Sequence, residues 1–261
     1  MNKESRDGSK KSSSTLERLV PVLLVLSIGL AFAVGMLWQK VSSIEKDEAQ
    51  VAGVAQPQGD AGEPKGPTQG LLSEAQAVKI PEITDRDHVR GSDDAQVVII
   101  EYSDYECPFC KKFHLTMQEV VDANAGKVAW VYRHYPLDAL HPKARTESMA
   151  AECAYKQGGD DAFWAMSDLI YEVTPSNNKL DLEELPKLAE QIGLNGEELQ
   201  ACIDAEEFKD FIEEQFQGGV TAGITGTPGN FIVAKDGRAW LLPGAIPLES
   251  IQTVIDEALQ G

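Results

Sequence analysis

Basic side chains are scarce in this chain of 261 residues, which has 23 lysines and arginines against 42 aspartates and glutamates. The formal net charge of −19 argues against a nucleic-acid-binding protein, because such a protein needs a basic surface that follows the phosphates. The acidic excess instead indicates a soluble surface whose charges repel one another. Hydrophobic residues make up 43% of the chain, which is enough for a globular core.

Cysteine and histidine are also scarce, with four of each. A structural zinc site needs four ligands, usually arranged as two closely spaced pairs. Only Cys107 and Cys110 form such a pair, since Cys153 and Cys202 stand alone and the histidines have no ligand spacing. We therefore expect no metal site and interpret Cys107 and Cys110 as a redox dithiol.

The dithiol lies where a strand is predicted to turn into a helix. The apolar run 97–100 predicts a short buried strand, and Pro108 suits the first position of a helix that continues to about Ala123. Free N–H groups and the helix dipole at this end favour a thiolate. We expect Cys107 to be the exposed attacking sulfur and Cys110, one turn deeper, to resolve mixed disulfides.

Several sequence segments occur in the order known from one family. They are GSDDA at 91–95, VVIIEYSDYECPFC at 97–110, WVYRHYPLD at 130–138, AECA at 151–154 and GTPGNFIV at 226–233. Together they resemble the DsbA-like branch of the thioredoxin-fold disulfide oxidoreductases, over about residues 85–261. A lone pair of cysteines separated by two residues would be weak support, but ordered segments of this length make a specific match.

The resemblance implies a thiol:disulfide oxidoreductase that needs no cofactor. Such an enzyme introduces disulfides into unfolded or partly folded exported proteins by exchange at Cys107 and Cys110, and a membrane redox partner reoxidises it. Two alternatives remain open on the same fold. One is a disulfide isomerase or reductase that a membrane partner keeps reduced, and the other is a non-catalytic chaperone or binding module.

The expected fold is α/β: a thioredoxin fold with an inserted α-helical subdomain, occupying residues 86–261. After the first helix, further strands are predicted at 128–132, 230–234 and 239–242, and an amphipathic helix at about 248–259. The Asp236-Gly237 pair predicts a hairpin between the last two strands. Helical segments at about 142–221 match the insertion that DsbA-like proteins carry.

The resemblance also assigns residues around the dithiol. Thr227-Pro228 matches the cis-proline position, where the backbone of the preceding residue can pair with an extended substrate chain. The alternative is an ordinary turn proline, and the small Gly229-Asn230 that follows departs from the family pattern. Glu101, six residues before Cys107, matches a buried acid that assists proton transfer to the deeper thiol. The alternative for Glu101 is a half-exposed strand carboxylate.

Pro108 and Phe109, between the two cysteines, are expected to tune the redox potential. The strong oxidases of the family have a histidine where this chain has Phe109, so we expect a weaker oxidant. Lys111 and Lys112, next along the helix, are interpreted as solvated surface residues. The histidines at positions 114, 134 and 141 are interpreted as partly exposed.

Cys153 and Cys202 fall in two predicted helices of the insertion. In an oxidising compartment two such cysteines are expected to pair as a structural disulfide, and related proteins carry a second disulfide in this region. The alternative is a pair of buried free thiols that behave as small hydrophobic groups.

The chain before the redox domain predicts a membrane-anchored protein. Residues 1–18 form a polar tail with five basic residues, and residues 19–38 contain no charge over a length that can span a bilayer. The basic tail favours a cytoplasmic N-terminus, which places the catalytic domain in the periplasm or cell exterior. Residues 39–85 are interpreted as a flexible linker. The alternative is a cleaved signal peptide, with Ala31-Phe32-Ala33 as the cleavage pattern, and a soluble periplasmic protein. A monomer is the default expectation.

Overall fold

The computed structural model describes residues 70–92 and 94–260. The predicted tail (1–18), the predicted membrane anchor (19–38) and the linker up to residue 69 lie outside the described residues. Within the described ranges, no helix has both the length and the apolar character needed to cross a bilayer.

Within the described part of the chain, six strands form one mixed sheet in the order β1-β6-β5-β3-β4-β2. In chain order the strands are β1 (Gly70–Leu71), β2 (His88–Gly91), β3 (Val97–Ser103), β4 (Val128–His134), β5 (Gly229–Ala234) and β6 (Ala239–Pro243). Only β3 and β4 are parallel within this sheet, and α3 connects them. Strands β5 and β6 form the predicted hairpin, and β5 pairs antiparallel with β3. This arrangement is the expected thioredoxin fold.

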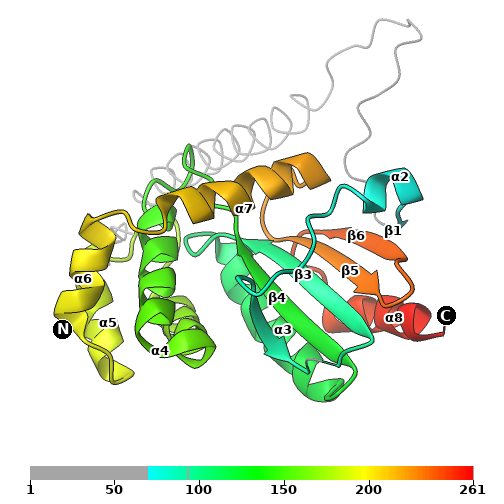
Figure 1. Ribbon diagram of the computed structural model, residues 1–261, viewed down its shortest axis with the longest axis horizontal. Helices are drawn as coiled ribbons and strands as arrows, with labels where there is room; N and C mark the ends of the chain where they lie inside the picture. Colours follow the sequence, from blue (N-terminus) through cyan, green and yellow to red (C-terminus); the bar gives the residue numbers. More distant parts are fainter. Residues whose placement is uncertain (1–69, 93, 261) are drawn as a thin grey trace, which may run out of the picture. The chain divides into compact units, whose positions relative to one another are not determined.

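The helices divide between the two faces of the sheet and its β2 edge (Figure 1). In chain order they are α2 (Glu74–Ala77), α3 (Pro108–Ala123), α4 (Ala144–Val173), a 3₁₀ turn (Leu182–Glu184), α5 (Leu185–Gln191), α6 (Gly196–Asp204), α7 (Lys209–Ala222) and α8 (Leu248–Leu259). Helices α3 and α8 cover one face, α7 covers the other, and α4 to α6 form the helical insertion beside β2 and β4. Helix α4 is kinked at Gly159, whose φ of 69° is not helical.

The alternation of side chains along β3 decides what lies beneath α3. Ile99 packs in the core with Phe113 of α3, whereas Ile100 packs in a second cluster on the α7 face. Successive strand residues point to opposite faces, so Glu101 and Ser103 share the α3 face with Ile99. An acid and a hydroxyl are thereby placed under the helix that carries the dithiol.

The insertion is cross-linked internally. Cys153 of α4 and Cys202 of α6 form a disulfide, as the resemblance implied, and both residues are buried. Their pairing joins two helices through cysteines that are 49 residues apart in the sequence.

The structure differs from the predicted boundary of the linker at residue 85, because residues 70–85 are part of the folded domain. The buried Arg133 guanidinium pairs with Asp87 and donates hydrogen bonds to the carbonyls of Pro81 at 3.1 Å and Glu82 at 2.9 Å. A buried guanidinium needs acceptors for its five N–H groups, and the segment before β2 supplies them. Strand β2 was not predicted, because its four residues have no apolar alternation.

Candidate active site

Cys107 is the residue that immediately precedes α3. Its backbone is extended, with φ −76° and ψ 120°, and Pro108 begins the helix as predicted. The Cys107 carbonyl accepts the first helical hydrogen bond, from the Lys111 N–H at 3.0 Å. The free N–H groups of Phe109 and Cys110 are therefore directed at the Cys107 sulfur.

The pKa values of the two thiols are shifted in opposite directions. The Cys110 thiol donates a hydrogen bond that lowers the pKa of Cys107 to about 6, and the Thr227 side chain and the Phe109 and Cys110 N–H groups act in the same direction against burial. Burial raises the pKa of Cys110 well above its usual range, and the nearby Cys107 and Glu101 raise it further. Cys107 is thus a thiolate at neutral pH, and Cys110 stays protonated.

Cys107 was predicted to be exposed, but only 4% of its surface is accessible. The reason is the loop before β5, whose Thr227 carbonyl lies 3.5 Å from the Cys107 sulfur. Sequence pattern did not reveal this cover, because the loop lies 120 residues further along the chain. Cys110 is fully buried, so Cys107 is still the shallower of the two thiols.

The Thr227–Pro228 peptide bond is cis. A hollow of about 200 Å³ adjoins it, lined by residues 223–229 and by Leu241, Pro243 and Gly244. A side chain on Gly229 would approach Ile224 to 2.8 Å, and the Asn230 amide is fixed by donating to the Leu242 carbonyl at 3.0 Å. The small Gly229-Asn230 pair therefore permits close packing of this loop.

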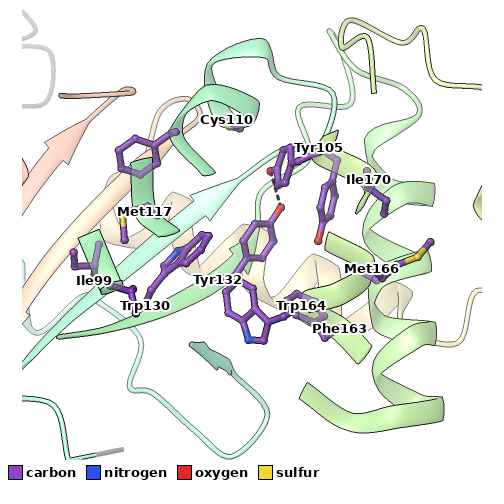
Figure 2. Close-up of a cluster of buried hydrophobic side chains, with 14 of the residues drawn as sticks. Ile99, Tyr105, Cys110, Met117, Trp130, Tyr132, Phe163, Trp164, Met166 and Ile170 are labelled. Atoms are coloured by element: carbon purple, nitrogen blue, oxygen red, sulfur yellow. Dashed lines mark hydrogen bonds between the residues drawn. The ribbon is translucent and has the colours of Figure 1, made fainter. Parts of the chain in front are cut away.

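Glu101 is fully buried beneath α3. Burial raises its pKa to about 8, against hydrogen bonds from Ser103 and Trp130 that lower it. The aromatic rings of Tyr105, Trp130 and Tyr132 gather on one side of Cys110 and exclude water from this region (Figure 2). A carboxyl group in these surroundings is protonated at neutral pH and can serve as a proton donor.

Replacing Glu101 by glutamine is expected to change how the rate of disulfide exchange depends on pH. Glu101 loses its proton near pH 8, so the wild-type profile should bend there, whereas a neutral amide has no charge to lose. We expect exchange about tenfold slower at pH 7 in Glu101→Gln, without the bend near pH 8. Glu119→Gln, on the exposed side of α3, is the matched control. A Glu101→Gln profile that matches the control would remove Glu101 from the reaction.

Sequence reasoning missed a group of buried acids just before the dithiol. Glu106 accepts hydrogen bonds from the backbone N–H groups of Asn177, at 2.8 Å through its carbonyl, and of Asn178, through its carboxylate. Burial and the adjacent Glu106 raise the pKa of Glu147 to about 10. Asp104 accepts from the Leu137 N–H at 2.8 Å. The contacts of Glu106 hold the turn before Cys107 against the insertion, and that of Asp104 joins it to the segment after β4. The acidic residues alone gave no signal of these contacts.

The basic residues also differ from expectation. His114, predicted to be partly exposed, is buried and lies 2.7 Å from an oxygen of Asp168. The Lys111 ammonium donates to the Thr174 carbonyl at 2.6 Å, just past the end of α4, whereas Lys112 is exposed as predicted. His134 and His141 are buried as well, on Glu152 and Asp104. Each of these three buried histidines is hydrogen-bonded to a carboxylate from another part of the chain.

A family model described as Thioredoxin matches residues 84–257. DsbA2 of Pseudomonas aeruginosa is 30% identical with a TM-score of 0.57, covering 67% of this chain and 96% of its own. A thioredoxin-like oxidoreductase of Silicibacter pomeroyi is 26% identical with a TM-score of 0.56, covering 73% of this chain and 99% of its own. BdbD of Bacillus subtilis, 22% identical with a TM-score of 0.59, covers 76% of this chain and 100% of its own and shows the same fold.

The curated relatives of this chain are named as Na(+)/H(+) antiporters and not as oxidoreductases. The Na(+)/H(+) antiporter NhaA 1 of Salinispora arenicola is 30% identical over 196 residues, which is 75% of this chain and 28% of the antiporter. The antiporter NhaA 3 of Salinispora tropica is 30% identical over 64% of this chain and 24% of its own length. The chain thus spans about a quarter of the length of these curated relatives.

Proposed function

Because the chain belongs to the DsbA-like branch of the thioredoxin-fold family, we propose that it is a thiol:disulfide oxidoreductase that introduces disulfides into exported proteins. The observation that carries this proposal is the placement of the dithiol: Cys107 immediately precedes α3 beside the cis-proline loop, and Cys110 is buried behind it. This placement lowers the pKa of Cys107 and raises that of Cys110. The antiporter name belongs to proteins of which this chain spans only about a quarter.

The proposed reaction starts from the oxidised Cys107–Cys110 pair. A substrate thiolate attacks the Cys107 sulfur, the Cys107–Cys110 bond breaks, and Cys110 leaves with the electron pair and takes up a proton. The second substrate thiolate then attacks the substrate sulfur of the mixed disulfide and releases Cys107. The substrate loses two electrons and two protons; one proton ends on Cys110 and the other in solvent, because Cys107 leaves as a thiolate. The extended substrate chain pairs with the backbone at Thr227 and Pro228.

The proposal is tested by mixing the oxidised protein with a reduced, unstructured peptide that contains two cysteines. We expect one disulfide in the peptide and one reduced Cys107/Cys110 pair for each turnover, measured by mass spectrometry after alkylation. A peptide that stays reduced would refute oxidoreductase activity. Alkylating the thiols in living cells then shows in which direction the enzyme works. A Cys107/Cys110 pair that is mainly oxidised supports an oxidase, and a pair that is mainly reduced supports an isomerase or reductase.

A redox potential between those of thioredoxin and DsbA is expected. The pKa of about 6 for Cys107 lies between about 7 in thioredoxin and about 3.5 in DsbA, whose potentials are about −270 and −120 mV. A more acidic attacking thiol stabilises the reduced form and makes the disulfide a stronger oxidant. Equilibrium with glutathione, followed by alkylation, measures the potential; a value as high as about −120 mV contradicts the weaker oxidant.

Phe109→His is expected to make the pair more oxidising. Phe109 is 63% exposed beside the dithiol and can neither donate a hydrogen bond nor carry charge towards the Cys107 thiolate. An imidazolium there should lower the pKa of Cys107, and each unit of that lowering raises the potential by about 30 mV. Phe109→Leu is the control for the lost ring. Equal potentials for the histidine and leucine variants would exclude this residue from tuning.

Membrane attachment is proposed from the sequence. Residues 19–38 have the length and lack of charge of a single span, with the basic residues before them on the cytoplasmic side. The redox domain then works outside the cytoplasm as a monomer and is reoxidised by a membrane redox partner. The N-terminal sequence of the protein purified from cells tests this, since a chain that starts at Val34 has lost the anchor.

A further inference from the structure

The Ser103 hydroxyl occupies a junction under the dithiol. It donates a hydrogen bond to a carboxylate oxygen of Glu101 at 2.6 Å and lies 2.9 Å from the Tyr171 hydroxyl. Its hydroxyl opposes the rise in the pKa of the Cys110 thiol, which places it near that sulfur. Ser103 is fully buried and lies on the same face of β3 as Glu101, beneath the helix that carries Cys110. One hydroxyl is therefore hydrogen-bonded to the buried acid and lies near the buried thiol.

Cys110 must change its protonation state in every turnover. It leaves the disulfide as a thiolate during substrate oxidation, and it must lose a proton to attack Cys107 when a mixed disulfide is resolved. The thiol has no exposed surface, so bulk water cannot supply or remove this proton directly. Among the described residues, Ser103 is the one whose side chain hydrogen-bonds to the Glu101 carboxyl group within 3 Å, at 2.6 Å.

We infer that the Ser103 hydroxyl carries the proton between Glu101 and Cys110, a role that rests on the oxidoreductase function proposed above. When Cys110 leaves as a thiolate, Ser103 gives it the hydroxyl proton and takes the carboxyl proton of Glu101. Ser103 ends unchanged, Cys110 becomes a thiol and Glu101 a carboxylate. In the reverse direction, Cys110 gives its proton to Ser103 as its sulfur attacks Cys107, and Ser103 passes a proton to Glu101.

Tyr171 acts as a positioning residue for this transfer. Its hydroxyl holds the Ser103 oxygen from the side of α4 and is in turn 3.0 Å from the Tyr132 hydroxyl of β4. The titratable groups that face Glu101 are Cys107, just before α3, Cys110 from α3, Tyr132 from β4 and Tyr171 from α4. All of them are acids, and the residue opposite Glu101 on β5 is the neutral Asn230. A proton that leaves Cys110 therefore has Glu101 as its acceptor in those molecules whose Glu101 is ionised, a fraction that grows as the pH approaches 8.

The test uses the reduced full chain and an aromatic disulfide reagent that releases a coloured thiolate, dithiobis-nitrobenzoate. Cys107 attacks first and releases one equivalent. Cys110 then attacks the mixed disulfide and releases the second, and only this step needs the proton of Cys110. We expect Ser103→Ala to leave the first release unchanged and to slow the second at least about tenfold between pH 6 and 8, toward the 100-fold typical of a lost acid–base group.

Three further variants separate proton transfer from packing. Ser103→Thr keeps the hydroxyl and should restore the second release, and Tyr171→Phe should slow it less than Ser103→Ala does. Ser167→Ala removes another buried hydroxyl, which bonds to Tyr105 at 2.7 Å, and should behave as wild type.

Each result of this series is decisive. Equal second releases in Ser103→Ala and wild type overturn the inference, as does an equal slowing in Ser103→Ala and Ser167→Ala. If Ser103→Ala fails to fold, Tyr171→Phe decides in the same assay: slowing relative to Ser167→Ala supports the role and an unchanged rate overturns it. A wild-type chain without a first release would instead refute the oxidoreductase function itself.

Discussion

Replacing Cys107 by serine is expected to abolish disulfide exchange, with a loss of at least roughly 1000-fold, because a hydroxyl cannot form the mixed disulfide. The loss follows from the position of this sulfur at the start of α3, where it alone combines a lowered pKa with contact to the cis-proline loop. The oxidation of a reduced two-cysteine peptide measures it. A Cys107→Ser chain that still prevents aggregation of an unfolded protein would indicate a chaperone rather than an enzyme.

Cys110→Ser is the matched partner of this variant. Cys107 remains a nucleophile there, but no resolving thiol stands behind it, so mixed disulfides with substrates should accumulate. Non-reducing electrophoresis and mass spectrometry identify them. If the two serine variants trapped equal amounts of substrate, the assignment of Cys107 as attacking sulfur would fail.

The second large effect is on stability. Replacing both Cys153 and Cys202 by alanine is expected to lower the free energy of unfolding by roughly 4 kcal/mol in the chain-entropy description, because the disulfide closes a loop of 49 residues. Urea unfolding of the variant and of the wild type measures this difference. Exchange at Cys107 should continue, since the disulfide lies within the insertion and not beneath α3.

The control replaces Cys107 and Cys110 by alanine. It is compared with wild type in which Cys107 and Cys110 are reduced and the Cys153–Cys202 disulfide is intact. That change also removes two buried sulfurs, but no cross-link is lost in the reduced state. A loss of stability as small as about 1 kcal/mol for Cys153→Ala/Cys202→Ala would show that the unfolded chain gains little freedom without the bridge.

The sequence allowed prediction of features that depend on neighbours along the chain. The apolar run at 97–100, the proline at the start of α3 and the Asp-Gly turn specify strand, helix and hairpin locally, and the family motifs place Pro228 and the dithiol. The burial of Glu101 was implied only by the family resemblance, and a half-exposed carboxylate was the alternative; the fold buries it fully.

Other parts of the site depend on contacts that local pattern does not encode. The hydroxyl of Ser103 meets that of Tyr171 across 68 residues, and the loop at Thr227 covers Cys107 across 120. The carboxylate of Glu106 resembles any surface acid in the sequence, yet the fold buries it against Asn178. Such partners emerge only once the insertion has packed against the sheet.

The strand at one end of the sheet, β2, has a consequence for the proposed work on unfolded chains. It is only four residues long. Long, bare strand edges are templates on which a misfolded polypeptide can add and start an aggregate. The short β2 offers little such template, so we expect this edge of the sheet to resist co-aggregation with an unfolded substrate.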